Sequence, residues 1–292
     1  MKTKSKIKWA KRLWYGLGKL PLPILYLVSD LVCLVLYHLL RYRREVVAEN
    51  LRLAFPEKSD RERRKIERQF YHYFCDTFIE APKMMTWSPE QIRRHFAISG
   101  TEAVAELSRA GKDIILYMGH YGQWEWIPSI ALWVPEIDCA QIYERLRDPV
   151  ADELIRANRQ AFGSRSVERR NTLRYMVAMH QAGKPYAVGF VADQSPSINQ
   201  LLHYETFFGL EVPVYLGAEK ITHRLGLEPF FLEVRRIRRG YWQAEVRPLP
   251  KSGPSLTTTF YQLLEEMIRR DPPYYLWSHK RFQYAKQLPT RH

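Results

Sequence analysis

The sequence predicts an α/β fold, in which a mixed sheet flanked by helices follows an N-terminal helical region that anchors the protein to a membrane. Short apolar runs bounded by turn residues alternate with helical segments from residue 112 onward, and strand–helix alternation produces a sheet with helices on its faces. Before residue 112 the periodic stretches are longer and typical of helices. The predicted strands are 113–118, 137–143, 185–192, 229–237 and 241–248, and the predicted helices between and after them are 123–133, 149–162, 171–182, 216–226 and 255–270.

The first forty residues combine a basic stretch with an apolar one. Lys and Arg recur through residues 1–19, and Leu20 to Leu40 is nearly continuous apolar sequence, close to the ~20 residues that span a bilayer. A secretory signal peptide is disfavoured, because arginines rather than a small-residue cleavage site follow at 41–44. On a helical wheel the polar side chains of this segment fall within one half. We therefore expect a membrane anchor that spans the bilayer or lies in its interface; the alternative is a buried core helix.

Helix-start signals occur between residues 41 and 110. Ser59 and Glu62 form a capping box before a long helix that reaches about residue 85. Ser88 followed by Pro89 starts a second helix, and Thr101 is expected to cap a third. The expected organisation is a basic N-terminus and anchor helix at 1–45, a helical region at 46–110 packed on the following domain, and an α/β domain at 111–292, with 46–292 as one unit.

Composition limits the partners without choosing among them. Lys and Arg number 45 against 31 Asp and Glu, a net charge of +14. Such an excess favours nucleic acid, anionic lipid headgroups or an acidic carrier protein. A nucleic-acid-binding protein is the rival of another class, but no recognised binding motif is present and the apolar segment has no purpose in it. The three widely spaced cysteines indicate neither a disulfide framework nor a metal site.

A histidine and an acid follow the first predicted strand, 113–118. His120 comes directly after Gly119 at the end of this strand, and Glu125 lies on the segment that follows. The carboxyl ends of strands are where ligands gather in α/β sheets. Gly119 and Gly122 allow a tight bend, so that His120 can act as a general base while Glu125 orients it. The alternative is a histidine that satisfies a backbone group beside a solvated acid; zinc is disfavoured, because the helical ligand spacing and a third ligand are missing.

Further motifs carry a family resemblance. They include Glu49–Pro56, Gly119–Glu125, Tyr143 with Arg145, Asp193-Gln194, and Trp277 to Arg281. In their order and spacing the chain resembles, from about Leu20 to Phe282, the bacterial late acyltransferases of lipid A biosynthesis (lauroyl/myristoyl-type), within the lysophospholipid-acyltransferase superfamily.

The resemblance implies a glycerophosphate-acyltransferase-like sheet and transfer of a fatty acyl chain from acyl carrier protein to a hydroxyl of a lipid A precursor. It implies His120 and Glu125 as the catalytic pair, with no metal or organic cofactor, because the thioester supplies the electrophile. Substrate-binding residues carried over are Arg145, Asp193 and Gln194. The family commonly reads Tyr-Arg-Pro where this chain has Tyr143-Glu144-Arg145, so Arg147 is a rival to Arg145.

The resemblance also sets the expected location and leaves the acceptor open. Acyl carrier protein is cytosolic, so we expect an enzyme of the inner membrane whose catalytic domain faces the cytoplasm. The tract from Ser195 to Gly209 is expected to shape the choice of acceptor or of chain length. Within the same superfamily the acceptor alternatives are a lysophospholipid, an aminolipid or another glycolipid.

Overall fold

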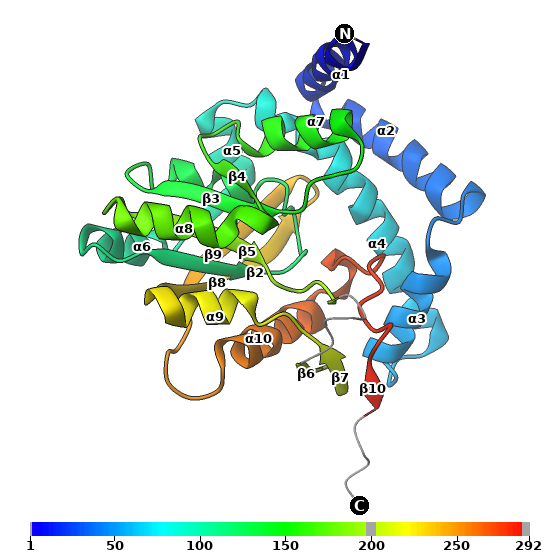
Figure 1. The fold of residues 1–292 in the computed structure, drawn as a ribbon. Helices are drawn as coiled ribbons and strands as arrows, with labels where there is room; N and C mark the ends of the chain where they lie inside the picture. Colours follow the sequence, from blue (N-terminus) through cyan, green and yellow to red (C-terminus); the bar gives the residue numbers. More distant parts are fainter. Residues whose placement is uncertain (1, 197–202, 288–292) are drawn as a thin grey trace, which may run out of the picture.

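A seven-stranded mixed sheet flanked by helices forms the centre of the molecule (Figure 1). The computed structural model describes residues 2–196 and 203–287. The strands run in the order β1-β9-β8-β2-β5-β3-β4, and all neighbouring pairs are parallel except the β8–β9 hairpin. Their bounds are β1 Phe96–Ser99, β2 Ile114–Met118, β3 Asp138–Tyr143, β4 Arg165–Glu168, β5 Tyr186–Val191, β8 Glu228–Arg238 and β9 Tyr241–Pro248.

A small antiparallel sheet and a set of helices surround this sheet. The small sheet has the order β10-β7-β6, with β6 at Tyr204–Phe207, β7 at Leu210–Pro213 and β10 at Lys286–Gln287. The helices of the α/β part are α6 Thr101–Arg109, η3 Ile127–Leu132, α7 Pro149–Arg159, η4 Arg169–Asn171, α8 Thr172–Gln181, α9 Gly217–Leu225, α10 Leu256–Arg270 and η6 Pro272–Tyr274. The N-terminal helices are α1 Lys2–Lys19, α2 Leu22–Leu34, η1 Val35–Leu39, α3 Arg44–Ala54, α4 Asp60–Glu80, η2 Ala81–Met85 and α5 Pro89–His95.

The predicted fold class and strands are confirmed. Each predicted strand appears within one residue of its expected bounds at either end, because apolar or alternating runs between turn residues leave little choice of local structure. Strand β2 is buried along its whole length, as a central parallel strand should be. The predicted capping box forms at Ser59 with Glu62, and Ser88 caps the second helix as expected, there in a capping box with Gln91.

Three local expectations are wrong. The helix expected at 123–133 is a turn followed by the 3₁₀ helix η3, where Pro128 has no N–H to continue an α-helix. Thr101 is the first residue of α6, whose N-cap is Gly100 in the left-handed region with φ 76. The short strand β1 lies in a region expected to be entirely helical; its pairing with β9 is long-range and leaves no local pattern.

Helix α2 lies against α4 with one face and exposes the other (Figure 1). The polar half predicted on the wheel faces the protein: the Tyr26 hydroxyl donates to Glu80 Oε1 at 2.8 Å and the Ser29 hydroxyl to Asp76 Oδ1 at 2.7 Å. On the opposite face Leu27 and Leu31 are 71% and 64% exposed. Leu22–Leu39 is long and apolar enough to cross a membrane, by length and composition alone.

Arg239, in the turn between β8 and β9, joins α2 to α4. Its guanidinium donates to both carboxylate oxygens of buried Asp76 at 2.7 and 2.9 Å and to Asp30 Oδ1 at 2.6 Å. Burial on its own would lower the pKa of Arg239, but these hydrogen bonds raise it above its usual value. The apolar helix is therefore fixed to the fold by a charge network as well as by packing.

We expect Arg239→Met to lower the free energy of unfolding by about 2 kcal/mol, because the buried Asp76 carboxylate loses its hydrogen-bonded counter-charge and keeps only Arg236 at 4.0 Å. The value is below that of a fully buried pair, since the Arg239 side chain is 32% exposed. Urea unfolding measures the change. The control Arg170→Met removes a 75% exposed arginine that pairs with Glu168, and should change stability by less than about 1 kcal/mol. Equal effects would contradict the role given to Arg239.

Candidate active site

His120 and Asp193 lie at the carboxyl ends of two adjacent parallel strands. The β2–β5 register pairs Met118 with Val191, and each of the two functional residues follows its strand by two positions. Parallel pairing therefore brings together side chains that are far apart in the chain. This edge of a parallel sheet is where α/β proteins bind ligands.

Two hydrogen bonds join the pair. His120 Nδ1 lies 2.8 Å from Asp193 Oδ1, and the His120 backbone N–H donates to Oδ2 at 3.0 Å. Asp193 is 3% exposed, whereas the His120 side chain is 17% exposed and lines the apolar pocket described below. Burial on its own would raise the pKa of Asp193, but the His120 imidazole and its hydrogen bonds lower it to about 2. An ionised Asp193 only accepts, so the proton of neutral His120 sits on Nδ1 and the lone pair is on Nε2.

The C-terminal segment holds both members of this pair. The Leu276 N–H donates to the His120 carbonyl at 3.0 Å, and the Ser195 N–H donates to His279 Nε2 at 3.2 Å. Burial lowers the pKa of His279 to about 4, although Asp193 opposes the shift, so its ring is a neutral acceptor at pH 7. His279 belonged to a recognised motif, but its place beside Asp193 could not be read from the sequence.

Contrary to expectation, Glu125 does not contact His120. Its carboxylate accepts from Arg159 in a bidentate pair, at 2.6 Å from Nη2 and 3.0 Å from Nε, and from Trp124 Nε1 at 3.1 Å. The physical reason is local. Gly122, with φ 62, turns the chain, and residues 123–126 form no helix, so Glu125 faces α7 instead of His120. The acid at His120 Nδ1 is Asp193, which the sequence had indicated only as a substrate-binding residue.

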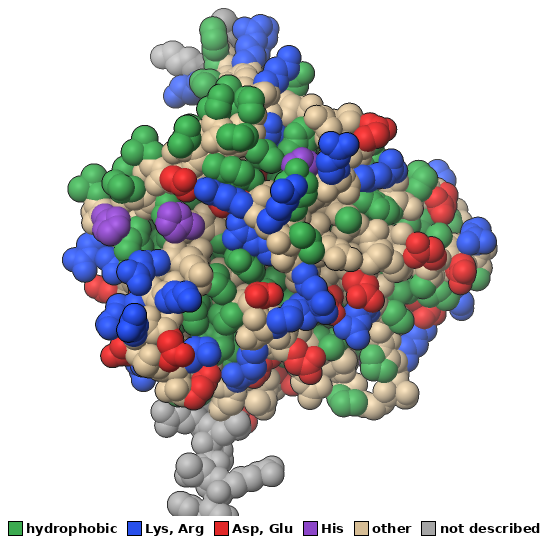
Figure 2. Space-filling view, turned by 180° about the vertical axis from the view of Figure 1, so that it is seen from behind, with side chains coloured by type: hydrophobic (Ala, Val, Ile, Leu, Met, Phe, Trp, Pro, Cys, Tyr) green, Lys and Arg blue, Asp and Glu red, His purple; other side chains and the backbone are tan. Residues whose placement is uncertain are grey.

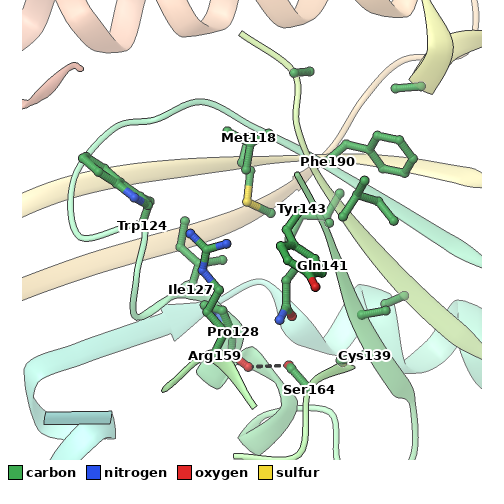
Figure 3. Close-up of a pocket in the computed structure, with 18 of the residues that line it drawn as sticks. Met118, Trp124, Ile127, Pro128, Cys139, Gln141, Tyr143, Arg159, Ser164 and Phe190 are labelled. Atoms are coloured by element: carbon green, nitrogen blue, oxygen red, sulfur yellow. Dashed lines mark hydrogen bonds between the residues drawn. The ribbon is translucent and has the colours of Figure 1, made fainter. Parts of the chain in front are cut away.

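A pocket of about 500 Å³ opens at His120 (Figure 3). Its wall is mainly apolar and comes from β2, β3, β5, η3, α7 and α9, a size and character typical of small-ligand sites. Figure 3 shows Met118, Ile127 and Phe190 around the hollow, with the Arg159 guanidinium extending into it opposite Gln141. Ser164 donates to the Pro128 carbonyl at 2.6 Å and closes one side of the wall.

The other predicted binding residues lie at different depths. Gln194 is exposed and lines the pocket, whereas Arg145 and Arg147 are exposed on the loop after β3 and do not. Arg145 lies 3.9 Å from Asp152 and 4.0 Å from Glu168, which is too far for hydrogen bonds. Residues 197–202 of the tract expected to shape specificity are outside the described residues. Within 2–196 and 203–287, no group of three or more His, Cys, Asp or Glu could hold a metal ion.

Arg159 is a pocket residue that the sequence analysis missed. It lies on α7 one turn after Ile155 and two turns after Asp152, and all three line the pocket. Their spacing of three and four places them on one helix face. An arginine on the same helix face as Ile155 was the available signal, but Arg156 and other charges nearby obscured it.

Comparisons with known proteins identify the relatives of this chain. A family model described as "Bacterial lipid A biosynthesis acyltransferase" matches residues 3–284. The chain is 22% identical to the lipid A biosynthesis palmitoleoyltransferase of Escherichia coli K12, over 92% of this chain and 90% of the relative. It is 23% identical to the lipid A biosynthesis lauroyltransferase of the same organism, over 96% and 94%. A lipid A biosynthesis acyltransferase of Shigella flexneri is 22% identical over 92% and 90%.

The lowered pKa of Asp193 predicts an acid-dependent loss of stability. Its folded pKa of about 2 is below the ordinary 3.8, so its contribution is complete above 3.8 and is lost as pH falls through 2. We expect the stability advantage of the unaltered protein over Asp193→Asn to shrink by about 1 kcal/mol between about pH 6 and pH 3. Urea unfolding at both values measures it. The exposed control Glu57→Gln should show no such trend; the same trend there would contradict the assignment.

Proposed function

Because the chain belongs to the bacterial lipid A biosynthesis acyltransferase family, we propose that it transfers a fatty acyl chain from an acyl carrier protein thioester to a hydroxyl of a lipid A precursor. The observation that carries the proposal is the His120–Asp193 pair at the mouth of an apolar pocket. A general base beside an apolar pocket suits a reaction between a hydroxyl and the thioester of a fatty acid.

In the proposed mechanism His120 Nε2 accepts the proton of the acceptor hydroxyl while the hydroxyl oxygen attacks the thioester carbonyl. The Nδ1–H to Asp193 holds the ring in the required tautomer and stabilises the imidazolium. The tetrahedral intermediate then collapses, its carbon–sulfur bond breaks, and His120 returns the proton to the departing thiolate. The proton passes from the hydroxyl through His120 to the thiolate, and the electron pair of the broken carbon–sulfur bond leaves with the sulfur. The reaction therefore needs no other co-reactant.

Glu125 acts in this proposal through Arg159. The bidentate pair fixes the guanidinium in the pocket wall near His120, where a positive group favours charge that develops on a bound carbonyl or on an anionic acceptor. The exposed Arg145 and Arg147 supply positive charge outside the pocket, in reach of a phosphorylated acceptor or an acidic carrier protein.

The apolar pocket is proposed to hold the fatty acyl chain. Gly189 lies at the middle of β5 and lines it, and a methyl group added there would approach Met118 Cε to 2.8 Å. The side chains around Gly189 therefore limit how far a fatty acyl chain can extend into the pocket. Since removal of methylene groups from water is favourable by about 0.8 kcal/mol each, chain length translates directly into binding free energy.

The membrane placement proposed here is interfacial. The polar face of α2 is occupied by α4 and Arg239, whereas Ile24, Leu27, Leu31 and Leu34 are exposed. A helix that spanned the bilayer would have to leave these polar partners. Contact of the apolar face with the inner membrane, from the cytoplasmic side where the carrier protein resides, brings the site to a lipid acceptor.

We expect Asp193→Asn to lower kcat by about 10²–10⁴, because the ring loses its tautomer and its counter-charge. His120→Ala should lose at least as much. Turnover of an acyl carrier protein thioester with a lipid A precursor, followed by mass spectrometry of the product, measures both. Near-normal turnover of His120→Ala would show the mechanism to be wrong; activity only on a lysophospholipid or aminolipid would overturn the acceptor.

A double-mutant cycle tests the role given to Glu125. Because Glu125 and Arg159 form one unit, the losses of Glu125→Gln and Arg159→Met should be far from additive in kcat/KM. The matched cycle of Glu125→Gln with Asp193→Asn should be close to additive. Additive losses for Glu125 with Arg159, together with non-additive losses for Glu125 with Asp193, would show that Glu125 acts on His120 and would contradict this role.

We expect Gly189→Val to shift donor preference toward shorter acyl chains, because the added side chain fills the pocket beside Met118. The kcat/KM for the longest chain accepted by the unaltered enzyme should fall about tenfold or more. Competition among thioesters of graded length measures the shift. An unchanged preference with full activity would place the acyl chain elsewhere.

A further inference from the structure

A second hollow, of about 590 Å³, lies beside the junction of α1 and α2. It shares no lining residue with the pocket at His120. Its wall combines Pro21 and Leu22 of the junction with side chains of η2, α5 and β9. The charged and aromatic lining residues are Lys19, Tyr26, Lys83, Trp87, His95, Arg239 and Tyr241.

Lys83 is the unusual member of this lining. It is only 4% exposed, and its ammonium donates to the Leu20 carbonyl at 2.6 Å. Among residues 2–196 and 203–287 no carboxylate forms an ion pair with it, and burial lowers its pKa. An ammonium has three N–H donors, and a buried cation without a counter-ion is unfavourable. Its placement in the wall of an open hollow indicates that the counter-charge comes from a ligand.

Other cations surround the same hollow. Lys83, Arg94 and Arg238 all lie close enough to His95 to lower its pKa, although burial has the larger effect. His95 is stacked between Trp87 and Tyr241, with ring centroids 4.2 Å apart on each side, and its Nδ1 lies 2.7 Å from the Gly240 carbonyl. The charge of Arg239 is already matched by Asp30 and Asp76. The excess of positive charge around the hollow therefore comes from Lys83 and its exposed cationic neighbours.

The position of the hollow identifies the class of ligand. The helices on either side expose apolar side chains: Trp9 and Leu13 of α1 are 63% and 74% exposed, and Leu27 of α2 is 71% exposed. Figure 2 shows Lys and Arg side chains gathered beneath α1, next to apolar ones. A cationic hollow between two apolar surfaces matches a molecule with an anionic head and hydrocarbon tails.

We propose that this hollow binds the phosphate of an anionic membrane lipid, with Lys83 as its buried ligand. The proposal rests on the interfacial membrane placement proposed above and is independent of the reaction at His120. It gives α1 and α2 a defined lipid contact at their junction, in addition to the general attraction of a basic surface.

Sedimentation of the full chain with vesicles tests the site. We expect phosphatidylglycerol vesicles to bind at least tenfold more tightly than phosphatidylcholine vesicles. Lys83→Met removes the ammonium, which lies 5.5 Å from the centroid of the Trp87 ring, and keeps a side chain of similar length. It should weaken phosphatidylglycerol binding about tenfold or more, while phosphatidylcholine binding stays unchanged. The control Lys112→Met removes the same charge from an exposed loop and should weaken binding by less than about fivefold, the effect of one surface cation. Equal losses in the two variants would overturn the proposal.

A second measurement uses the unaltered protein, so it does not depend on a variant that folds. Short-chain phosphatidylglycerol should raise the thermal unfolding midpoint at concentrations where short-chain phosphatidylcholine and inorganic phosphate do not. Equal stabilisation by phosphatidylcholine, or by inorganic phosphate alone, would overturn a lipid-phosphate site. So would a Lys83→Met variant that binds vesicles normally but has a raised KM for the phosphorylated acceptor in detergent. Neither binding assay follows acyl transfer, so their failure would leave the proposed reaction untouched.

Discussion

The parallel pairing of β2 with β5 is the constraint on which the site depends. Both strands are central in the sheet, and their register sets Met118 opposite Val191. From that pairing, two short extensions carry His120 and Asp193 to a distance of 2.8 Å. The same two strands contribute to the wall of the apolar pocket, so His120 and the pocket are placed by one set of backbone hydrogen bonds.

The two acids are equally buried and differ in their partners. Asp193 lies behind the histidine with 3% exposure, where only its ionised form satisfies both His120 donors. Glu125 is also buried, but its partner is a cation from α7. Two carboxylates around one histidine would repel each other in a site of low dielectric. The arginine resolves this conflict and at the same time places a positive group in the pocket wall.

The N-terminal region is built into the fold around the candidate site. Helix α2 presents its polar side to α4 and the β8–β9 turn, and its apolar side outward. Glu80 on α4 accepts from Tyr26 of α2 and from Gln123 of the active-site loop, so one buried carboxyl contacts both the apolar helix and the residues next to His120. Burial raises the pKa of Glu80 to about 7. The apolar helix is thus an integral part of the scaffold around the site.

By itself the sequence determined the elements with strong local patterns: the apolar runs of the central strands, the helix starts at Ser59 and Ser88, the apolar α2 segment, and the place of His120 at a strand end. Only the tertiary structure decided which acid meets it. Strand order and register depend on contacts between residues far apart in the chain, and a short local motif does not specify them. The turn after Gly122 directed Glu125 to Arg159, and the neighbouring strand supplied Asp193 in its place.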